Sequence, residues 1–335
     1  MEVRIAATAY ALPPDVETVE SILEREKARV EAALSPLSAP LRKRALDGLG
    51  VERVRVCGQK QPYDLALEAA AAALAEAGVA AREIDLIVDF STLPGEQAQY
   101  LSFAQKLSAD LGAETSLNFS YKVGGCGGLH LALKNAQALM AADERLRTAL
   151  LVAADSPPAG SRSLLPVTVQ GDAGSAVVLR RGSGEGPALL ATEVLSLSHL
   201  YDTITISRHA NGSGDLVINV DSARLQNELM PIYYLNFWRL VNQTLSRKSL
   251  HLGDVDHFLY SNISRTDREG FRKALEVSEE KFYSIRLAEY GHTLASDLVI
   301  NYTDLRREGR MRPGQLLLFA SAGIGFTWGV SLARV

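Results

Sequence analysis

Cys126 lies in the glycine run Gly-Gly-Cys-Gly-Gly at 124–128. The residues before this run favour a short strand over 116–121, and those after it favour an apolar helix over 129–144. A thiol at the start of a helix feels the positive end of the helix dipole, which favours the nucleophilic thiolate. The pattern indicates a nucleophilic cysteine. The alternative is a small apolar cysteine packed in a glycine bend.

His292 and Asp297 form the second candidate pair. His292 follows a turn at Tyr290–Gly291, and we expect it to open a helix over 293–308. A carboxylate that accepts a hydrogen bond from the imidazole fixes the histidine tautomer and stabilises the imidazolium. The pair therefore indicates a general base with its orienting acid. The alternative is a capping histidine beside a surface aspartate.

A third candidate is the glycine bend in the sequence SAGIGFTWG at 321–329. It separates two apolar runs that predict strands over 315–321 and 326–335. Such a bend can present backbone N–H groups to an oxyanion, although it could equally be an ordinary hairpin. It lacks the GxGxxG spacing and the strand-to-helix setting of a dinucleotide site.

The elements that must position these residues alternate between strand and helix, which predicts an α/β protein with a parallel sheet. A glycine-rich turn at 182–187 separates two series of similar order. We therefore predict two halves, 1–182 with the cysteine and 183–335 with the histidine, the aspartate and the bend. The other expected strands are 1–11, 84–92, 148–155, 171–181 and 257–261, and the other expected helices are 64–78, 98–112, 225–249 and 265–275.

Composition excludes several classes of protein. The 335 residues carry a net charge of −4 and are 47% hydrophobic, which is typical of a globular protein. No apolar run is long enough for a membrane span, and the N-terminus lacks the pattern of a signal peptide. Two cysteines form no disulfide framework, so we expect a cytoplasmic location and a structural role for Cys57. Scattered basic residues and unpaired histidines predict neither nucleic-acid binding nor a metal site.

Taken together and in order, these segments resemble ketoacyl-ACP synthase III of the thiolase superfamily. GGCGG stands at the position of that family's cysteine nucleophile, and GDAGSAVVL (171–179) is similar to its GDGA-type turn. The C-terminal segment 311–335 is the most specific match. VDHFLYSNIS (255–264) and YGHTLAS (290–296) stand where the family carries its HQAN and GN motifs. The resemblance implies a five-layered αβαβα thiolase fold built from two duplicated halves, and a homodimer.

Two departures from the family pattern bear on the reaction. Ser261 occupies the position of the HQAN histidine and His292 that of the GN asparagine, which puts decarboxylative condensation in doubt. The pattern GHxxxxD resembles a natural-product branch with a Cys-His-Asp triad. By that resemblance Cys126 attacks a thioester, His292 deprotonates the acceptor and Asp297 orients His292. The backbone N–H groups of Cys126 and Ile324 would form the oxyanion hole, and Ser261 would be a polar group of the pocket.

The expected donor is a phosphopantetheine thioester, with no permanently bound cofactor. Relatives that use coenzyme A carry a tryptophan before an RTGI-like stretch, whereas this chain reads RKRALDGLGVERV over 42–54, with Gly48 at the arginine position. We therefore favour an acyl carrier protein over acyl-CoA. Arg42, Lys43 and Arg44 could meet the acidic surface of a carrier, or could be a solvated helix face.

We therefore predict an acyltransferase of secondary metabolism that moves an acyl group through Cys126 to a hydroxyl or amine acceptor. A ketosynthase III-type enzyme that forms a carbon–carbon bond with a β-keto nucleophile is the alternative within the same fold. Two readings from other classes stay open. The first is an α/β-hydrolase with the order Cys126, Asp256 and His292. The second is a non-catalytic partner subunit.

Overall fold

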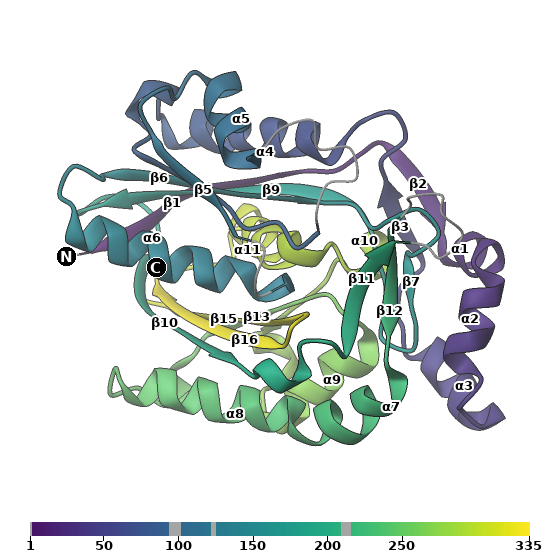
Figure 1. Ribbon diagram of the computed structural model, residues 1–335. Coiled ribbons are helices and arrows are strands. Elements are labelled where there is room, and N and C mark those ends of the chain that lie inside the picture. The colour runs from purple at the N-terminus through teal and green to yellow at the C-terminus, as the bar shows by residue number, and fades with distance from the viewer. Residues whose placement is uncertain (1, 94–101, 122–124, 209–215) are drawn as a thin grey trace.

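The computed structural model describes residues 2–93, 102–121, 125–208 and 216–335 (Figure 1). Helices and sheet alternate in the layer order αβαβα, as the resemblance implied. The layers contain six principal helices: α4 (Pro62–Ala77), α5 (Phe103–Leu111), α6 (Gly128–Ala142), α8 (Met230–Ser246), α9 (Arg265–Ala274) and α11 (Asp297–Arg307). α4 and α5 cover one outer face, α6 and α11 lie between the two parts of the sheet, and α8 and α9 cover the other outer face.

The strands of these layers form one 10-stranded sheet. Those of the first half are β1 (Val3–Ala11), β4 (Leu86–Asp89), β5 (Leu117–Ser120), β6 (Thr148–Asp155) and β9 (Ala173–Arg181). Those of the second half are β10 (Ala188–Ser196), β13 (His257–Tyr260), β14 (Phe282–Tyr283), β15 (Leu316–Gly323) and β16 (Thr327–Arg334). Both halves have the same order, β5-β4-β6-β9-β1 and β14-β13-β15-β16-β10, and the pair Arg4↔Ala188 joins them. The fold is therefore duplicated, and the domain boundary after residue 182 stays a prediction.

The sheet is mixed rather than parallel. β4 runs parallel to β5 and β6, and β13 runs parallel to β14 and β15, but the last strand of each half is antiparallel to its neighbours. The physical reason is clearest for β15 and β16, because a short turn can only return a strand antiparallel. The sequence also missed β10, since ALLATEVLS (188–196) does not alternate cleanly between apolar and polar residues.

Local sequence explains why the outer helix α4 begins and ends where it does. Pro62 occupies the first turn, Gln61 and Asp64 form a capping box, and Gly78 ends the helix in the left-handed conformation with φ 59°. Its alanine-rich face packs against β1 and β9. β6 is buried along its whole length, as a strand between two helical layers must be.

The remaining elements gather at one end of the layers and surround the site (Figure 1). They are β2 (Asp15–Thr18), α1 (Val19–Arg25), α2 (Lys27–Leu34), α3 (Ala39–Asp47), β3 (Arg53–Val56), β7 (Ser163–Leu164), β8 (Thr168–Val169), β11 (Ile204–Arg208), β12 (Leu216–Val220), α7 (Ser222–Arg224) and α10 (Leu287–Tyr290). Short helical turns lie elsewhere along the chain: η1 (Ala81–Glu83), η2 (Gly125–Gly127), η3 (Ser198–Leu200), η4 (Leu225–Leu229), η5 (Leu252–Asp254), η6 (Glu279–Lys281) and η7 (Leu294–Ser296). Among the helices of the described ranges, none is long and apolar enough to cross a membrane.

Candidate active site

Cys126 lies on the turn η2, directly before the central helix α6, and is 6% exposed. Its side chain packs among the apolar residues Leu93 and Leu294. Gly125 before it has φ 49°, and a Cβ there would lie 2.4 Å from the backbone nitrogen of Ile324. A side chain is therefore excluded at this position. The cysteine turn and the β15–β16 turn consequently lie in direct contact, while Gly124 falls outside the described residues.

His292 is held through its backbone rather than by a helix. Its N–H donates to the Val169 carbonyl at 3.0 Å, and its own carbonyl accepts from the Gly171 N–H at 3.0 Å. The prediction that His292 opens a helix is wrong, because α11 begins at Asp297. Leu294 between them has φ 55°, a left-handed conformation that an α-helix does not allow.

The three predicted side chains form a continuous hydrogen-bonded chain. His292 Nε2 lies 3.1 Å from Cys126 Sγ, and His292 Nδ1 lies 2.6 Å from Asp297 Oδ2. Burial alone would lower the pKa of His292, but the charge of Asp297, the nearby Cys126 and their hydrogen bonds raise it well above its ordinary value. The arrangement therefore favours a proton on the imidazole beside the sulfur.

Asp297 is buried, and its carboxylate accepts further hydrogen bonds. Oδ1 accepts from the Thr293 backbone N–H at 2.8 Å and from the Thr293 hydroxyl at 2.6 Å. Oδ2 accepts from the Asn262 backbone N–H at 2.7 Å. These donors satisfy a charge that burial would otherwise make costly. The sequence analysis did not identify Thr293 or Asn262, and their backbone N–H groups leave no signal in a sequence.

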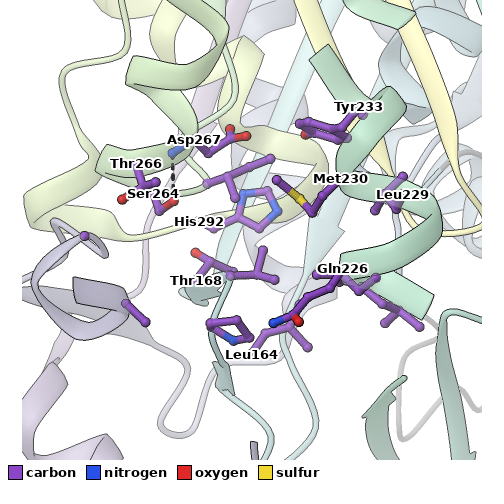
Figure 2. Close-up of a pocket in the computed structure, with 18 of the residues that line it drawn as sticks. Leu164, Thr168, Gln226, Leu229, Met230, Tyr233, Ser264, Thr266, Asp267 and His292 are labelled. Carbon is purple, nitrogen blue, oxygen red and sulfur yellow. Dashed lines mark hydrogen bonds between the residues drawn. The ribbon is translucent and has the colours of Figure 1, made fainter. Parts of the chain in front are cut away.

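A cavity of about 470 Å³ opens onto Cys126 and His292. Its walls come from α3, the β7–β8 hairpin, the η4–α8 segment, the start of α9 and the β15–β16 turn. Figure 2 shows His292 between Leu164 and Gln226 on one side and Asp267 and Tyr233 on the other. Apolar side chains dominate the walls, which suits an acyl chain or another largely apolar substrate.

Three other residues that the sequence analysis considered lie outside the hydrogen-bonded chain of Cys126, His292 and Asp297. Ser261 is buried, its hydroxyl has no partner, and it is not among the described residues that line the cavity, so its pocket role stays a prediction. Asp256 accepts a hydrogen bond from the Leu316 N–H at 2.7 Å and takes no part in the His292 contacts. Burial and Asp172 raise the pKa of Cys57 to about 12, which keeps that thiol protonated.

Comparison with known proteins shows which family the chain is similar to. A family model described as 3-oxoacyl-[acyl-carrier-protein (ACP)] synthase III C terminal matches residues 245–335. The beta-ketoacyl-[acyl-carrier-protein] synthase III of Rhodospirillum rubrum is 29% identical over 341 residues, covering 99% of this chain and 98% of the relative. The Rhodospirillum centenum enzyme of the same name is 29% identical over 280 residues, covering 81% of this chain and 83% of the relative. This chain is similar to ketoacyl-ACP synthase III over nearly its whole length.

Solved structures agree on the fold. The 3-oxoacyl-[acyl-carrier-protein] synthase III of Aquifex aeolicus aligns with a TM-score of 0.82 at 22% identity, over 99% of this chain and 100% of that one. A structure titled ChlB3, an acyltransferase, aligns with a TM-score of 0.80 at 24% identity, over 100% of this chain and 98% of that one. The predicted thiolase fold is therefore confirmed, and the α/β-hydrolase alternative is wrong. The protein is an enzyme of the transferase and condensing class that this family represents.

The aromatic residues of the segment 195–245, which the resemblance places near the pocket and which could equally be core, take different places in the structure. Of the aromatic residues in the segment 195–245, Tyr233 and Tyr234 line the cavity, whereas Tyr201 and Trp238 are exposed. Asp267, which also lines the cavity, was not singled out at all. Its position near the start of an amphipathic helix suggested only the usual acidic residue of a first turn.

Proposed function

We propose that this enzyme transfers an acyl group from a phosphopantetheine thioester, through an acyl-Cys126 intermediate, to a hydroxyl or amine acceptor of secondary metabolism. The observation that carries the proposal is the continuous chain from Cys126 Sγ through His292 to Asp297, with distances of 3.1 Å and 2.6 Å. A nucleophile, a base and an orienting acid in this order are the parts that acyl transfer needs.

In the first step, Cys126 Sγ attacks the thioester carbonyl while its proton resides on His292 Nε2. The carbon–sulfur bond to phosphopantetheine breaks, and the departing thiolate takes the proton from His292. Asp297 stabilises the imidazolium during this step, in keeping with the raised pKa of His292. The products are an acyl-cysteine and a free phosphopantetheine thiol.

In the second step, the neutral His292 Nε2 removes the proton from the acceptor's hydroxyl or amine. The acceptor oxygen or nitrogen bonds to the acyl carbon, the bond to Cys126 Sγ breaks, and the thiolate is again paired with the imidazolium. General-base help of this kind is worth about 10²–10⁴ in rate. Both steps therefore use the same nitrogen and leave the enzyme unchanged.

The backbone N–H groups of Cys126 and Ile324 are the proposed oxyanion hole. Support comes from the contact between the two turns, because Ile324 N lies where a Cβ of Gly125 would be only 2.4 Å away. The Ser321 hydroxyl also donates a hydrogen bond to the Cys126 carbonyl at 3.1 Å, and this bond links the cysteine turn to strand β15. A single oxyanion donor is worth roughly 10²–10³ in rate.

An acyl carrier protein is the proposed donor, and a homodimer the proposed assembly. Arg44 lines the cavity from α3, where a cation could meet an acidic carrier. Arg42 instead donates to the carbonyls of Leu37 and Ser35, and Lys43 pairs with Asp47. Of the three basic residues, only Arg44 thus faces the cavity, so we assign the carrier contact to it.

Carbon–carbon condensation is the second candidate, because the matched relatives are named synthases and one solved neighbour is titled a priming β-ketosynthase of a polyketide pathway. Against decarboxylative condensation stands Ser261 at the position of the HQAN histidine. This departure leaves a route in which acyl-Cys126 is attacked by a preformed β-keto carbanion.

Product analysis separates the two candidates. The enzyme is charged with a labelled acyl-carrier thioester and then offered alcohols, amines, a β-ketoacyl thioester and malonyl carrier. We expect labelled esters or amides and no release of carbon dioxide from malonyl carrier. A labelled carbon–carbon product, with no ester or amide formed, would replace the transferase proposal by the condensing one.

A further inference from the structure

Asp267 is a carboxylate in a mainly apolar cavity, outside the Cys126–His292–Asp297 chain. It is the third residue of α9, and its backbone N–H donates to the Ser264 hydroxyl at 3.2 Å (Figure 2). Its side chain lines the same cavity as His292 and Cys126. The backbone of Asp267 is therefore fixed by the helix start, and its side chain faces the cavity that a molecule bound beside the nucleophile would occupy.

One oxygen of this carboxylate is held and the other is unpartnered. Oδ1 accepts from the Tyr234 hydroxyl at 3.2 Å, and Gly270 makes this possible because a Cβ there would lie 2.3 Å from that hydroxyl. Oδ2 has less than 1 Å² of exposed surface and no donor in hydrogen-bonding geometry among the described residues, although the Tyr260 hydroxyl lies near enough to act against the raised pKa of this carboxyl. A buried carboxylate oxygen without a partner is costly, and the cost is recovered when a ligand supplies a donor.

Two cationic side chains of α9 are engaged elsewhere, and Arg44, which lines the same cavity from α3, forms no ion pair with Asp267 in the described part of the chain. Arg268 pairs with Glu269 and Glu279, and Arg272 pairs with the same two carboxylates. No ion pair reaches Asp267 from the described part of the chain, and the charge of His292 acts on it only from across the cavity. The group that would best complete this site is a cation carried by the substrate.

We propose that Asp267 determines acceptor specificity by binding an ammonium group of the acceptor through its Oδ2 atom. The inference rests on the acyl transfer proposed above and names the acceptor class as an amino alcohol or a similar cationic alcohol. The hydroxyl reacts at His292, and the ammonium is held at Asp267. Because the ammonium is protonated at neutral pH, it anchors the acceptor and does not compete as a nucleophile.

The partial reactions provide a direct test. Preformed acyl-enzyme is mixed with linear amino alcohols of increasing chain length and with the matched diols, and discharge is followed by intact-protein mass. We expect at least tenfold faster discharge by an amino alcohol than by its diol at the optimal length. In Asp267→Asn that ratio falls toward one, and in Glu269→Gln, a matched acidic control on the same helix, it stays as in the wild type.

The outcomes distinguish this inference from the proposed function. Equal rates for amino alcohols and diols in the wild type, or an unchanged ratio in Asp267→Asn, overturn the ammonium site while acyl transfer stands. If no acceptor discharges the acyl-enzyme, the transferase proposal itself fails. Calorimetric binding of the same ligands to Cys126→Ala protein then still tests the site. Binding of diols as tight as that of amino alcohols would overturn it.

Discussion

Asp297 illustrates how the candidate triad depends on neighbouring residues. Its two carboxylate oxygens accept hydrogen bonds from His292, Thr293 and Asn262, so the imidazole can take only one orientation. The carboxylate both selects the tautomer with a proton on Nδ1 and stabilises the imidazolium.

Replacement of Asp297 by asparagine therefore tests the orienting role. The amide keeps the size of the side chain but loses the charge that raises the pKa of His292. We expect acyl turnover to fall by about 10²–10⁴, the range associated with a general base. Rapid-quench kinetics on folded protein would measure this. A loss of less than tenfold would mean that Asp297 is only a structural partner of Asn262 and Thr293.

Asp267 gives a stability prediction that does not depend on any substrate. Burial raises the pKa of this carboxyl to about 6, while tyrosine hydroxyls and His292 act in the opposite direction. The native state then binds a proton more tightly than the unfolded state, so the contribution of Asp267 to stability falls as pH rises from about 4 to 6. The buried carboxylate is therefore destabilising at neutral pH, and Asp267→Asn removes this unfavourable contribution.

Urea unfolding of the wild type and Asp267→Asn measures that penalty. The stabilisation by the substitution should grow by about 2 kcal/mol between about pH 4.5 and pH 7, since one pKa unit corresponds to about 1.4 kcal/mol. A pH-independent difference between the two proteins would contradict the account of Asp267 as a buried, unpaired charge.

At the scale of single residues, the sequence was informative where side-chain type and spacing carry the chemistry. Cys126 was recognisable by its glycines, and His292 and Asp297 by their separation. Asp267 was not recognisable, because a first-turn acid on α9 is common and its burial depends on Tyr234 from another helix. Contacts between distant segments leave no local pattern.

At the scale of elements, the loop before α11 is what brings His292 to Cys126. Gly291 has φ 63°, and a Cβ there would lie 2.6 Å from the Val169 carbonyl and 2.7 Å from a methyl group of Val54. The bridge between His292 and the residues around Gln170 requires this close approach. The glycine therefore positions the candidate base.

Gly291→Ala should displace His292, whereas Gly309→Ala provides a matched control. Gly309 has a similar φ of 65°, but a Cβ added there would meet no atom within 4 Å, so only the backbone penalty applies. We expect Gly309→Ala to lose about 1 kcal/mol of stability, and Gly291→Ala to lose more, because Gly291 also has ψ −152°, a backbone conformation that is essentially restricted to glycine. At least tenfold lower acyl transfer is expected only in Gly291→Ala. Equal activity in the two variants would contradict the positioning role.

The start of α11 shows where sequence reasoning about elements failed. The residues from Thr293 onward look helical, but the backbone of His292 is bound to another strand segment and Leu294 is left-handed. Tertiary hydrogen bonds thus moved the helix start to Asp297. The predicted β6, by contrast, matched the structure over 148–155, because a fully buried strand has a strong apolar signal.

At the scale of the whole molecule, the duplicated architecture explains how residues from both halves meet in one candidate site. In each half a central helix precedes the fourth strand, and these are α6 and α11. Cys126 lies just before α6, and Asp297 is the first residue of α11. The duplicated architecture thus brings a nucleophile from one half to a histidine and an aspartate from the other, at the end that the surrounding elements enclose.

The central claim is that an acyl group becomes covalently attached to Cys126. Intact-protein mass spectrometry after mixing with acyl-carrier and acyl-CoA thioesters tests it most directly, beside Cys126→Ala and His292→Ala. We predict one acyl adduct per chain that is absent from Cys126→Ala. In His292→Ala the adduct should form more slowly and should not be discharged by acceptor. A folded enzyme that gains no adduct from any thioester, or an adduct that persists in Cys126→Ala, would contradict the account.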